Sequence, residues 1–242
     1  MITGAVGGSY KPLTDDNIRA IHEMTLRIME ETGIKVPNKQ ALEIFDRHGA
    51  GVDYETQIVK FPPSMVEEVI DKTPARVVLC GRKEEHDLVL EGPRTYLGTG
   101  GTVLNCLDLG TGERRPTTLE DVGNFALMTD ALDNVSFFVI NVYPNELPVE
   151  EVDVNRFFYS LTNTSKHVMG GIYTMEGLQR VVKMAEELAG GARQLRERPF
   201  ISFITCVMSP LLLNDTYTDF LIEAARLGIP LTTPAEPLAG AT

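Results

Sequence analysis

The residues that could do chemistry follow four short apolar segments of this sequence, at the point where each segment ends. The segments 135–141, 167–171, 200–205 and 229–232 are almost wholly apolar, as strands covered on both faces are. The carboxyl ends of parallel strands meet at one edge of a sheet, and in barrels that edge carries the active site. We therefore predict a binding site built from the side chains and backbone found there: Asn141, Tyr143, Gly171, Tyr173, Thr205, Ser209 and Glu236.

The chemistry of this set suits a cationic substrate. Tyr143 and Tyr173 present aromatic faces, which attract quaternary ammonium groups, and Glu236 adds an acidic side chain between two prolines. Ordinary structural roles stay open for the same residues. Asn141 has the residue type that often caps a turn, the tyrosines suit a half-exposed rim, and Glu236 suits a solvated surface.

Several other kinds of chemistry find no support in the sequence. No trio of metal ligands and no Ser-His-Asp arrangement occurs at the expected strand ends, so we predict no metal site. No lysine stands there either, which disfavours a Schiff-base lyase or aldolase. Three widely spaced cysteines without a CxxC pair argue against a disulfide framework or a zinc site. We interpret Cys206 as a core thiol and His167 as structural.

The elements expected to position the site alternate between strand and helix. Helices are expected at 119–132, before the first apolar segment, and at 149–162, 175–189 and 215–227, between the segments. Such alternation predicts a parallel sheet, whose two common closures are the (β/α)₈ barrel and the doubly wound sheet. The barrel is favoured because the glycines of segment 98–101 precede a strand and not a helix, unlike a nucleotide-binding fingerprint.

The first third of the chain has a different organisation. Residues 1–95 predict small helices mixed with short strands and show no regular alternation. We therefore predict an α/β protein in which a small mixed α+β region, 1–95, precedes an incomplete TIM-type (β/α)₈ barrel, 96–242. The segment near Val103, followed by a turn that suits a hairpin, is counted as the first of about five barrel strands where a complete barrel has eight. The expectation is that the barrel is truncated.

Composition limits the class of protein. The chain has 242 residues and a formal net charge of -12, which argues against a nucleic-acid binder. Its amino terminus lacks the basic start and apolar core of a signal peptide, and no run approaches the roughly 20 apolar residues that span a bilayer. We predict a soluble, cytoplasmic protein that contacts neither nucleic acid nor membrane.

Five short motifs, spread along the whole chain, carry a family resemblance. Their letters are GGSYKPLTDD at 7–16, EETGIKV at 30–36, GTGGT at 98–102, RPTTLED at 115–121 and PLAGAT at 237–242. Together they resemble the trimethylamine methyltransferase family. The resemblance implies a (β/α)₈ barrel that removes a methyl group from trimethylamine or from a betaine such as glycine betaine.

The resemblance also implies partners. The methyl group would pass to the Co(I) centre of a corrinoid carried by a cognate corrinoid protein, so this chain itself would bind no cofactor. Family members also lead us to expect a homo-oligomer. One branch of the family uses pyrrolysine, at a position expected after residue 242. The alternative is a truncated, non-catalytic fragment of such an enzyme that acts only by association.

Overall fold

The computed structural model describes residues 2–235. The chain divides into two compact units that interleave along the sequence. The first contains Met1–Val6, Arg76–Thr205 and Glu223–Thr232, and the second contains Gly7–Ala75, Cys206–Ile222 and Thr233–Thr242. The predicted boundary between an N-terminal region, 1–95, and a barrel, 96–242, stays a prediction.

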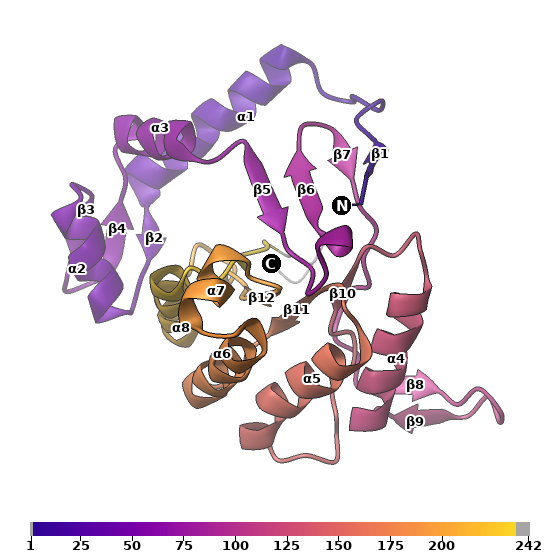
Figure 1. The fold of residues 1–242 in the computed structure, drawn as a ribbon. Helices are drawn as coiled ribbons and strands as arrows, with labels where there is room; N and C mark the ends of the chain where they lie inside the picture. Colours follow the sequence, from indigo (N-terminus) through magenta and orange to yellow (C-terminus); the bar gives the residue numbers. More distant parts are fainter. Residues whose placement is uncertain (1, 236–242) are drawn as a thin grey trace. The chain divides into compact units, whose positions relative to one another are not determined.

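A four-stranded parallel sheet forms the centre of the first unit (Figure 1). Its strands lie in chain order: β10 (Phe137–Val139), β11 (His167–Gly171), β12 (Ile201–Ile204) and β13 (Leu231–Thr232). The register pairs Phe138 with Val168 and Phe203 with Leu231. The predicted α/β class with a parallel sheet is thus confirmed.

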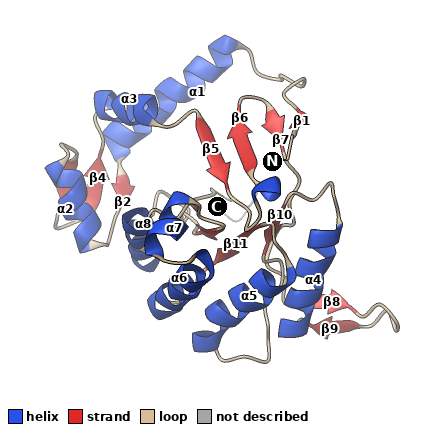
Figure 2. Cartoon of the chain, viewed as in Figure 1, coloured by secondary structure: helices blue, strands red, loops and turns tan. Residues whose placement is uncertain are grey.

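Helices connect these strands, as βα alternation requires. They are α4 (Leu119–Ala131), α5 (Val149–Asn163), α6 (Met175–Ala189), α7 (Ala192–Glu197) and α8 (Asp215–Leu227). Helix α5 packs against α4 on one side and α6 on the other (Figure 2). The Phe157 ring of α5 meets Phe203 of β12 edge to face, with 5.8 Å between centroids. Both side chains are fully buried, so they form part of the apolar core of this unit.

The neighbour of β10 on its other side is not the strand that the sequence suggested. Strands β8 (Asn105–Leu107) and β9 (Arg114–Pro116) form the expected hairpin, but they pair only with each other. Residues 98–103 run parallel to β10 instead, through bridges from Gly98 to Phe137 and from Val103 to Val142. A Cβ atom on Gly98 would lie 2.4 Å from the Phe137 ring, so this close approach requires glycine.

The remaining strands of this unit form antiparallel pairs. They are β1 (Ala5–Val6) with β7 (Arg94–Thr95), and β5 (Arg76–Leu79) with β6 (Leu88–Glu91). A short 3₁₀ helix, Glu84–His86, lies in the turn between the strands of the second pair.

The second unit packs helices on a small antiparallel sheet of order β2-β4-β3. Its elements are α1 (Asp15–Arg27) with a π-helical turn Ile28–Thr32, β2 (Ile34–Lys35), α2 (Lys39–Arg47), β3 (Gly51–Asp53), β4 (Ile58–Lys60) and α3 (Pro63–Lys72). Thr14 caps α1 through a capping box with Asn17. Val36, Leu42 and Val59 form the centre of a separate core.

No helix within residues 2–235 is both long and apolar enough to cross a membrane.

The end of helix α4 is held by a buried lysine. The Lys166 ammonium donates to the carbonyl oxygens of Thr129, Leu132 and Val135, at 2.7, 2.8 and 2.7 Å. All three oxygens lie at or just beyond the carboxyl end of the helix, where the helix dipole favours a cation. Lys166 directly precedes β11, so its side chain connects the carboxyl end of α4 to the start of that strand.

Replacing Lys166 with methionine is expected to lower the free energy of unfolding by about 2 kcal/mol, because three carbonyl groups lose a charged donor. Urea denaturation followed by circular dichroism measures the change. Lys183, an exposed residue of α6, gives the matched control, since Lys183→Met should leave stability within about 0.5 kcal/mol. Equal effects of both substitutions would contradict this role for Lys166.

Candidate functional site

Two tyrosines from neighbouring strand ends meet at the carboxyl edge of the parallel sheet. Tyr143 follows β10 and Tyr173 follows β11. Their ring centroids lie 5.6 Å apart, with an interplanar angle of 84°. This edge-to-face contact leaves both rings partly exposed. The aromatic pair predicted from the sequence is therefore assembled in the structure.

Beneath this pair lies a fully buried arginine. Arg156 comes from α5, and its Cζ atom lies 5.4 Å from the centroid of the Tyr173 ring. Its Nη2 donates to the Ile140 carbonyl at 3.1 Å and to the Thr102 hydroxyl at 3.4 Å. Its Nε and Nη1 atoms have no hydrogen-bond partner among the described residues. Burial lowers the pKa of Arg156, while the neighbouring Tyr173 and Asp153 favour its charged form.

A buried carboxylate fixes the loop that carries Tyr173. Asp153, three residues before Arg156 on α5, accepts from the backbone N–H of Tyr173 at 3.1 Å and of Thr174 at 3.0 Å. The Thr174 hydroxyl donates to the same carboxylate at 3.2 Å and also caps α6. Burial raises the pKa of Asp153, and the hydrogen bonds from Thr174 and Tyr173 act in the opposite direction. Asp153 therefore positions both the tyrosine and the start of α6.

Sequence reasoning missed Asp153 and Arg156 because both lie inside a helix and not at a strand end. The available signal was their helical spacing. Both share one face of α5 with apolar residues such as Phe157, and all of that face is buried. Charged residues on the apolar face of an amphipathic helix need buried partners or a ligand.

The other predicted residues have different surroundings. The Oδ1 atom of Asn141 is buried and has no partner among the described residues. Gly171 pairs with Ile204 inside the sheet, where a Cβ atom would meet nothing closer than 3.9 Å. Thr205 is buried, and its backbone N–H donates to Thr232 at 3.0 Å. Glu236 lies outside the described residues.

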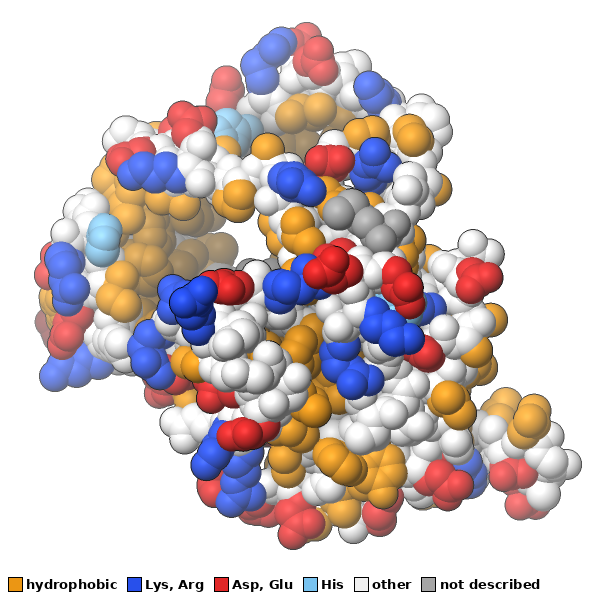
Figure 3. Space-filling model, viewed as in Figure 1, with side chains coloured by type: hydrophobic (Ala, Val, Ile, Leu, Met, Phe, Trp, Pro, Cys, Tyr) orange, Lys and Arg blue, Asp and Glu red, His pale blue; other side chains and the backbone are white. Residues whose placement is uncertain are grey.

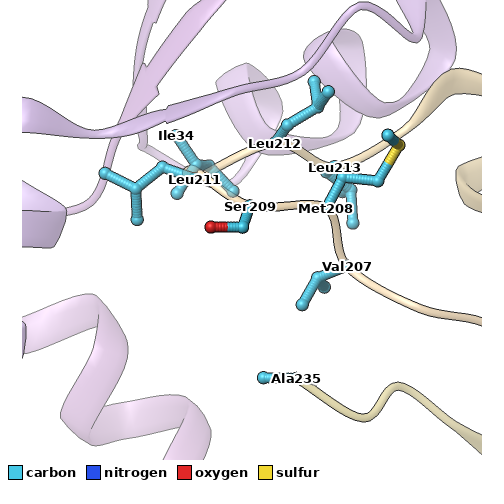
Figure 4. A pocket seen from close by; sticks show the side chains of 8 residues that line it. All are labelled: Ile34, Val207, Met208, Ser209, Leu211, Leu212, Leu213 and Ala235. Carbon is cyan, nitrogen blue, oxygen red and sulfur yellow. The ribbon is translucent and has the colours of Figure 1, made fainter. Parts of the chain in front are cut away.

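Ser209 belongs to the second compact unit. It lines a pocket of about 320 Å³ whose other walls are apolar (Figure 4). Those walls come from Ile34, Val207, Met208, Leu211, Leu212, Leu213 and Ala235. Because this pocket contains no charged side chain, it differs in chemistry from the tyrosine cluster of the first unit.

The loop after Tyr143 is ordered by an amide side chain. The Asn145 Nδ2 group donates to the carbonyl oxygens of Leu104, Thr117 and Tyr143 at 2.9, 3.0 and 3.1 Å. One side chain thus joins the backbone of three segments. Asn145 therefore has a structural role in holding Tyr143 at the edge of the sheet.

The motif at 115–121 forms an ion pair that starts helix α4. Two guanidinium nitrogens of Arg115 lie 2.7 and 2.8 Å from the carboxylate oxygens of Asp121. Thr118 and Asp121 also form a capping box. Hydrogen bonding from Arg115 is the main cause that lowers the pKa of Asp121 from 3.8 to about 2.

This shifted pKa predicts a pH dependence of stability. Since the pKa of Asp121 is depressed in the folded chain, its stabilisation is present above about pH 4 and is lost as the pH falls towards about 2. We expect Asp121→Asn to lower the free energy of unfolding by about 1–2 kcal/mol at pH 7, and by less as the pH falls. This range is reduced to allow for solvent screening, because the Arg115 side chain is partly exposed. Urea denaturation at each pH tests this, with the exposed Asp71→Asn variant as control. A difference that stays constant from pH 6 to pH 3 would contradict it.

Charged side chains of both signs are interspersed on the face drawn in Figure 3. Within the described part of the chain, no three His, Cys, Asp or Glu side chains are grouped so that they could hold a metal ion.

Comparisons with known proteins agree on one family. The sequence model of the family described as "Trimethylamine methyltransferase (MTTB)" matches residues 5–242. The trimethylamine methyltransferase MttB of Desulfitobacterium hafniense is 38% identical over 229 residues, which cover 95% of this chain and 46% of that protein. The glycine betaine methyltransferase of D. hafniense strain Y51 is 30% identical over 96% of this chain and 48% of its own length. The trimethylamine methyltransferase MttB of Methanosarcina thermophila is 29% identical over 94% of this chain and 48% of its own. The chain thus spans about half the length of the curated relatives it matches.

Proposed function

This chain belongs to the trimethylamine methyltransferase family, and on that premise we propose that it serves in a methyltransferase that demethylates a methylated amine or betaine. The methyl acceptor in this proposal is the Co(I) centre of a corrinoid carried by a cognate partner protein. No residue of this chain is assigned to the corrinoid, since the partner would carry it. The proposal places the protein in the cytoplasm and as a homo-oligomer.

One observation carries the proposal: the aromatic pair of Tyr143 and Tyr173 at the carboxyl edge of the parallel sheet. Aromatic faces attract quaternary ammonium groups, and methylated amines carry such a group or its protonated equivalent. The names of the relatives, trimethylamine and glycine betaine methyltransferases, describe the same class of compound.

The transfer needs little from this chain beyond positioning. The carbon–nitrogen bond of one methyl group would break, the electron pair of that bond would stay on nitrogen, and the less methylated amine would leave as the methyl group passes to the acceptor. The two tyrosines would hold the nitrogen, and the rigid sheet edge would aim one methyl group at the acceptor.

We also propose that the parallel sheet is part of a (β/α)₈ barrel. Its strands lie in chain order without a reversal. A doubly wound sheet reverses its strand order at a switch point, whereas a barrel does not.

Visible spectroscopy of the corrinoid tests the proposed function. The purified chain is mixed with a corrinoid protein in its Co(I) state, and trimethylamine or glycine betaine is then added. We expect an amine-dependent loss of the Co(I) spectrum and the appearance of the methylated form. Absence of change with every amine would overturn the proposal for this chain. If a full-length relative reacts under the same conditions while this chain does not, the alternative replaces the proposal: the chain then acts only by association and has no catalytic activity of its own.

A matched pair of variants connects the activity to the site. Tyr173→Leu should reduce the rate about fivefold, because a cation–π contact at a partly exposed ring contributes about 1 kcal/mol. Tyr54 lies in the second unit and is exposed, so Tyr54→Leu should leave the rate within about twofold, as surface substitutions usually do. Equal rates for both variants would contradict a role for the tyrosine pair in the reaction.

A further inference from the structure

Two hydrogen-bond donors of the Arg156 guanidinium, which lies beside the aromatic pair, have no acceptor among the described residues. Its Nε and Nη1 atoms are buried without a partner among the described residues, although Nη2 is engaged. Buried donors without an acceptor cost free energy, and nearly all such groups in native proteins are paired. The planar fork of an arginine matches a carboxylate especially well. The missing partner of Arg156 is therefore best supplied by a carboxylate.

Charge balance favours the same ligand. The Tyr143 and Tyr173 rings suit a cation, yet the Arg156 guanidinium lies 5.4 Å from the centroid of one of them. Asp153 is the nearest opposite charge to this guanidinium, but the Arg156 Nε and Nη1 atoms have no acceptor among the described residues, and a ligand with only a positive charge would leave them without one. The neighbouring Asp153 carboxylate already accepts hydrogen bonds from Tyr173 and Thr174. A zwitterion satisfies both features, because its ammonium group meets the rings and its carboxylate meets the arginine.

We propose that Arg156 determines substrate specificity by binding the carboxylate of a zwitterionic methylated amine, whose quaternary nitrogen is held by Tyr143 and Tyr173. This inference rests on the proposed function and narrows its substrate class to amino-acid betaines. Arg156 is fully buried, whereas Tyr173 is 37% exposed. Binding of a carboxylate at Arg156 would therefore require the Tyr173 side chain to move.

A comparison of two ligands on the unaltered chain tests the proposal first. Glycine betaine and its methyl ester both carry a trimethylammonium group, but only glycine betaine has a carboxylate. Isothermal titration calorimetry should give at least about tenfold tighter binding of glycine betaine, since hydrogen bonds to charged groups are among the stronger ones. Equal affinities, or tighter binding of the ester, would overturn the proposal.

Substitutions then assign the preference to one residue. Arg156→Gln should abolish the preference for glycine betaine over its ester, and Arg156→Lys should restore part of it because the positive charge returns. Arg180→Gln is the matched control, since Arg180 is an exposed residue of α6. A preference that survives Arg156→Gln would overturn the proposal. If Arg156→Gln does not fold, the ligand comparison decides alone.

The two proposals fail in different ways. Methyl transfer from trimethylamine or the ester, without any preference for glycine betaine, would keep the proposed function and overturn the role of Arg156. Failure of every methylated amine to bind or react would overturn both.

Discussion

Replacing Gly177 with alanine is expected to lower the free energy of unfolding by about 2–3 kcal/mol, the upper part of the usual range of about 1–3 kcal/mol for overpacking of a buried site. Gly177 lies in the first turn of α6, facing the Asp153 carboxylate. A Cβ atom there would lie 2.1 Å from Asp153 Oδ2 and 2.7 Å from its Cβ and Cγ atoms. Asp153 cannot move away without breaking its hydrogen bonds to Tyr173 and Thr174. The helix propensity of alanine offsets only about 1 kcal/mol of this strain.

Gly123 in α4 provides the matched control. It is also a buried glycine in a helix, but an added Cβ atom would approach only the side chains of Asn163 and Tyr159, at 3.2 and 3.4 Å. Gly123→Ala should therefore change stability by less than about 1 kcal/mol, since helix propensity and mild crowding oppose each other. Urea denaturation of both variants measures the difference. Similar values for the two would contradict the packing described for Gly177.

Removing the carboxylate itself has the second large effect. Asp153→Ala should lower the free energy of unfolding by about 3 kcal/mol or more, because two backbone N–H groups lose their acceptor and the buried Arg156 loses its nearest opposite charge. The exposed Glu151 on the same helix is the control, and Glu151→Ala should be nearly neutral. Calorimetric binding of glycine betaine should also weaken, since the Tyr173 loop is no longer fixed.

The double variant tests whether the two effects share one cause. Once Asp153 is alanine, the Cβ atom of Gly177→Ala no longer meets a carboxylate. The two losses of stability should therefore sum to more than the loss of the double variant, by about 1–3 kcal/mol, as for residues in direct contact. Additive losses would mean that Gly177 and Asp153 act independently.

The sequence predicted the elements of the parallel sheet because their patterns are local. Apolar segments of strand length between helical patterns are visible without any knowledge of the fold. Tyr143 and Tyr173 could be singled out for the same reason, since each directly follows such a segment. The hairpin near Cys106 was predicted as well. Its place in the sheet was not, because residues 98–103 lie beside β10 through close approach at Gly98 and not through a strand pattern.

The charged part of the candidate site could not be found by the same reasoning. Asp153 and Arg156 stand three positions apart in a helix, a spacing that commonly indicates an exposed ion pair. Only the packing of α5 on the sheet shows that both are buried and that they act on the Tyr173 loop. Ser209 was predicted from its position after an apolar segment, but the chain enters the other compact unit at residue 206.

The most direct measurement of the central claim is the NMR spectrum of the protein with ¹³C-labelled tyrosine rings, titrated with glycine betaine. The Tyr143 and Tyr173 signals are assigned with the Tyr143→Phe and Tyr173→Phe variants. We predict saturable shifts of these two signals, since ammonium groups bind over aromatic faces, while the exposed Tyr10 and Tyr54 signals stay in place. Shifts confined to other tyrosines, or none at saturating ligand, would contradict a methylated-amine site at this edge of the sheet.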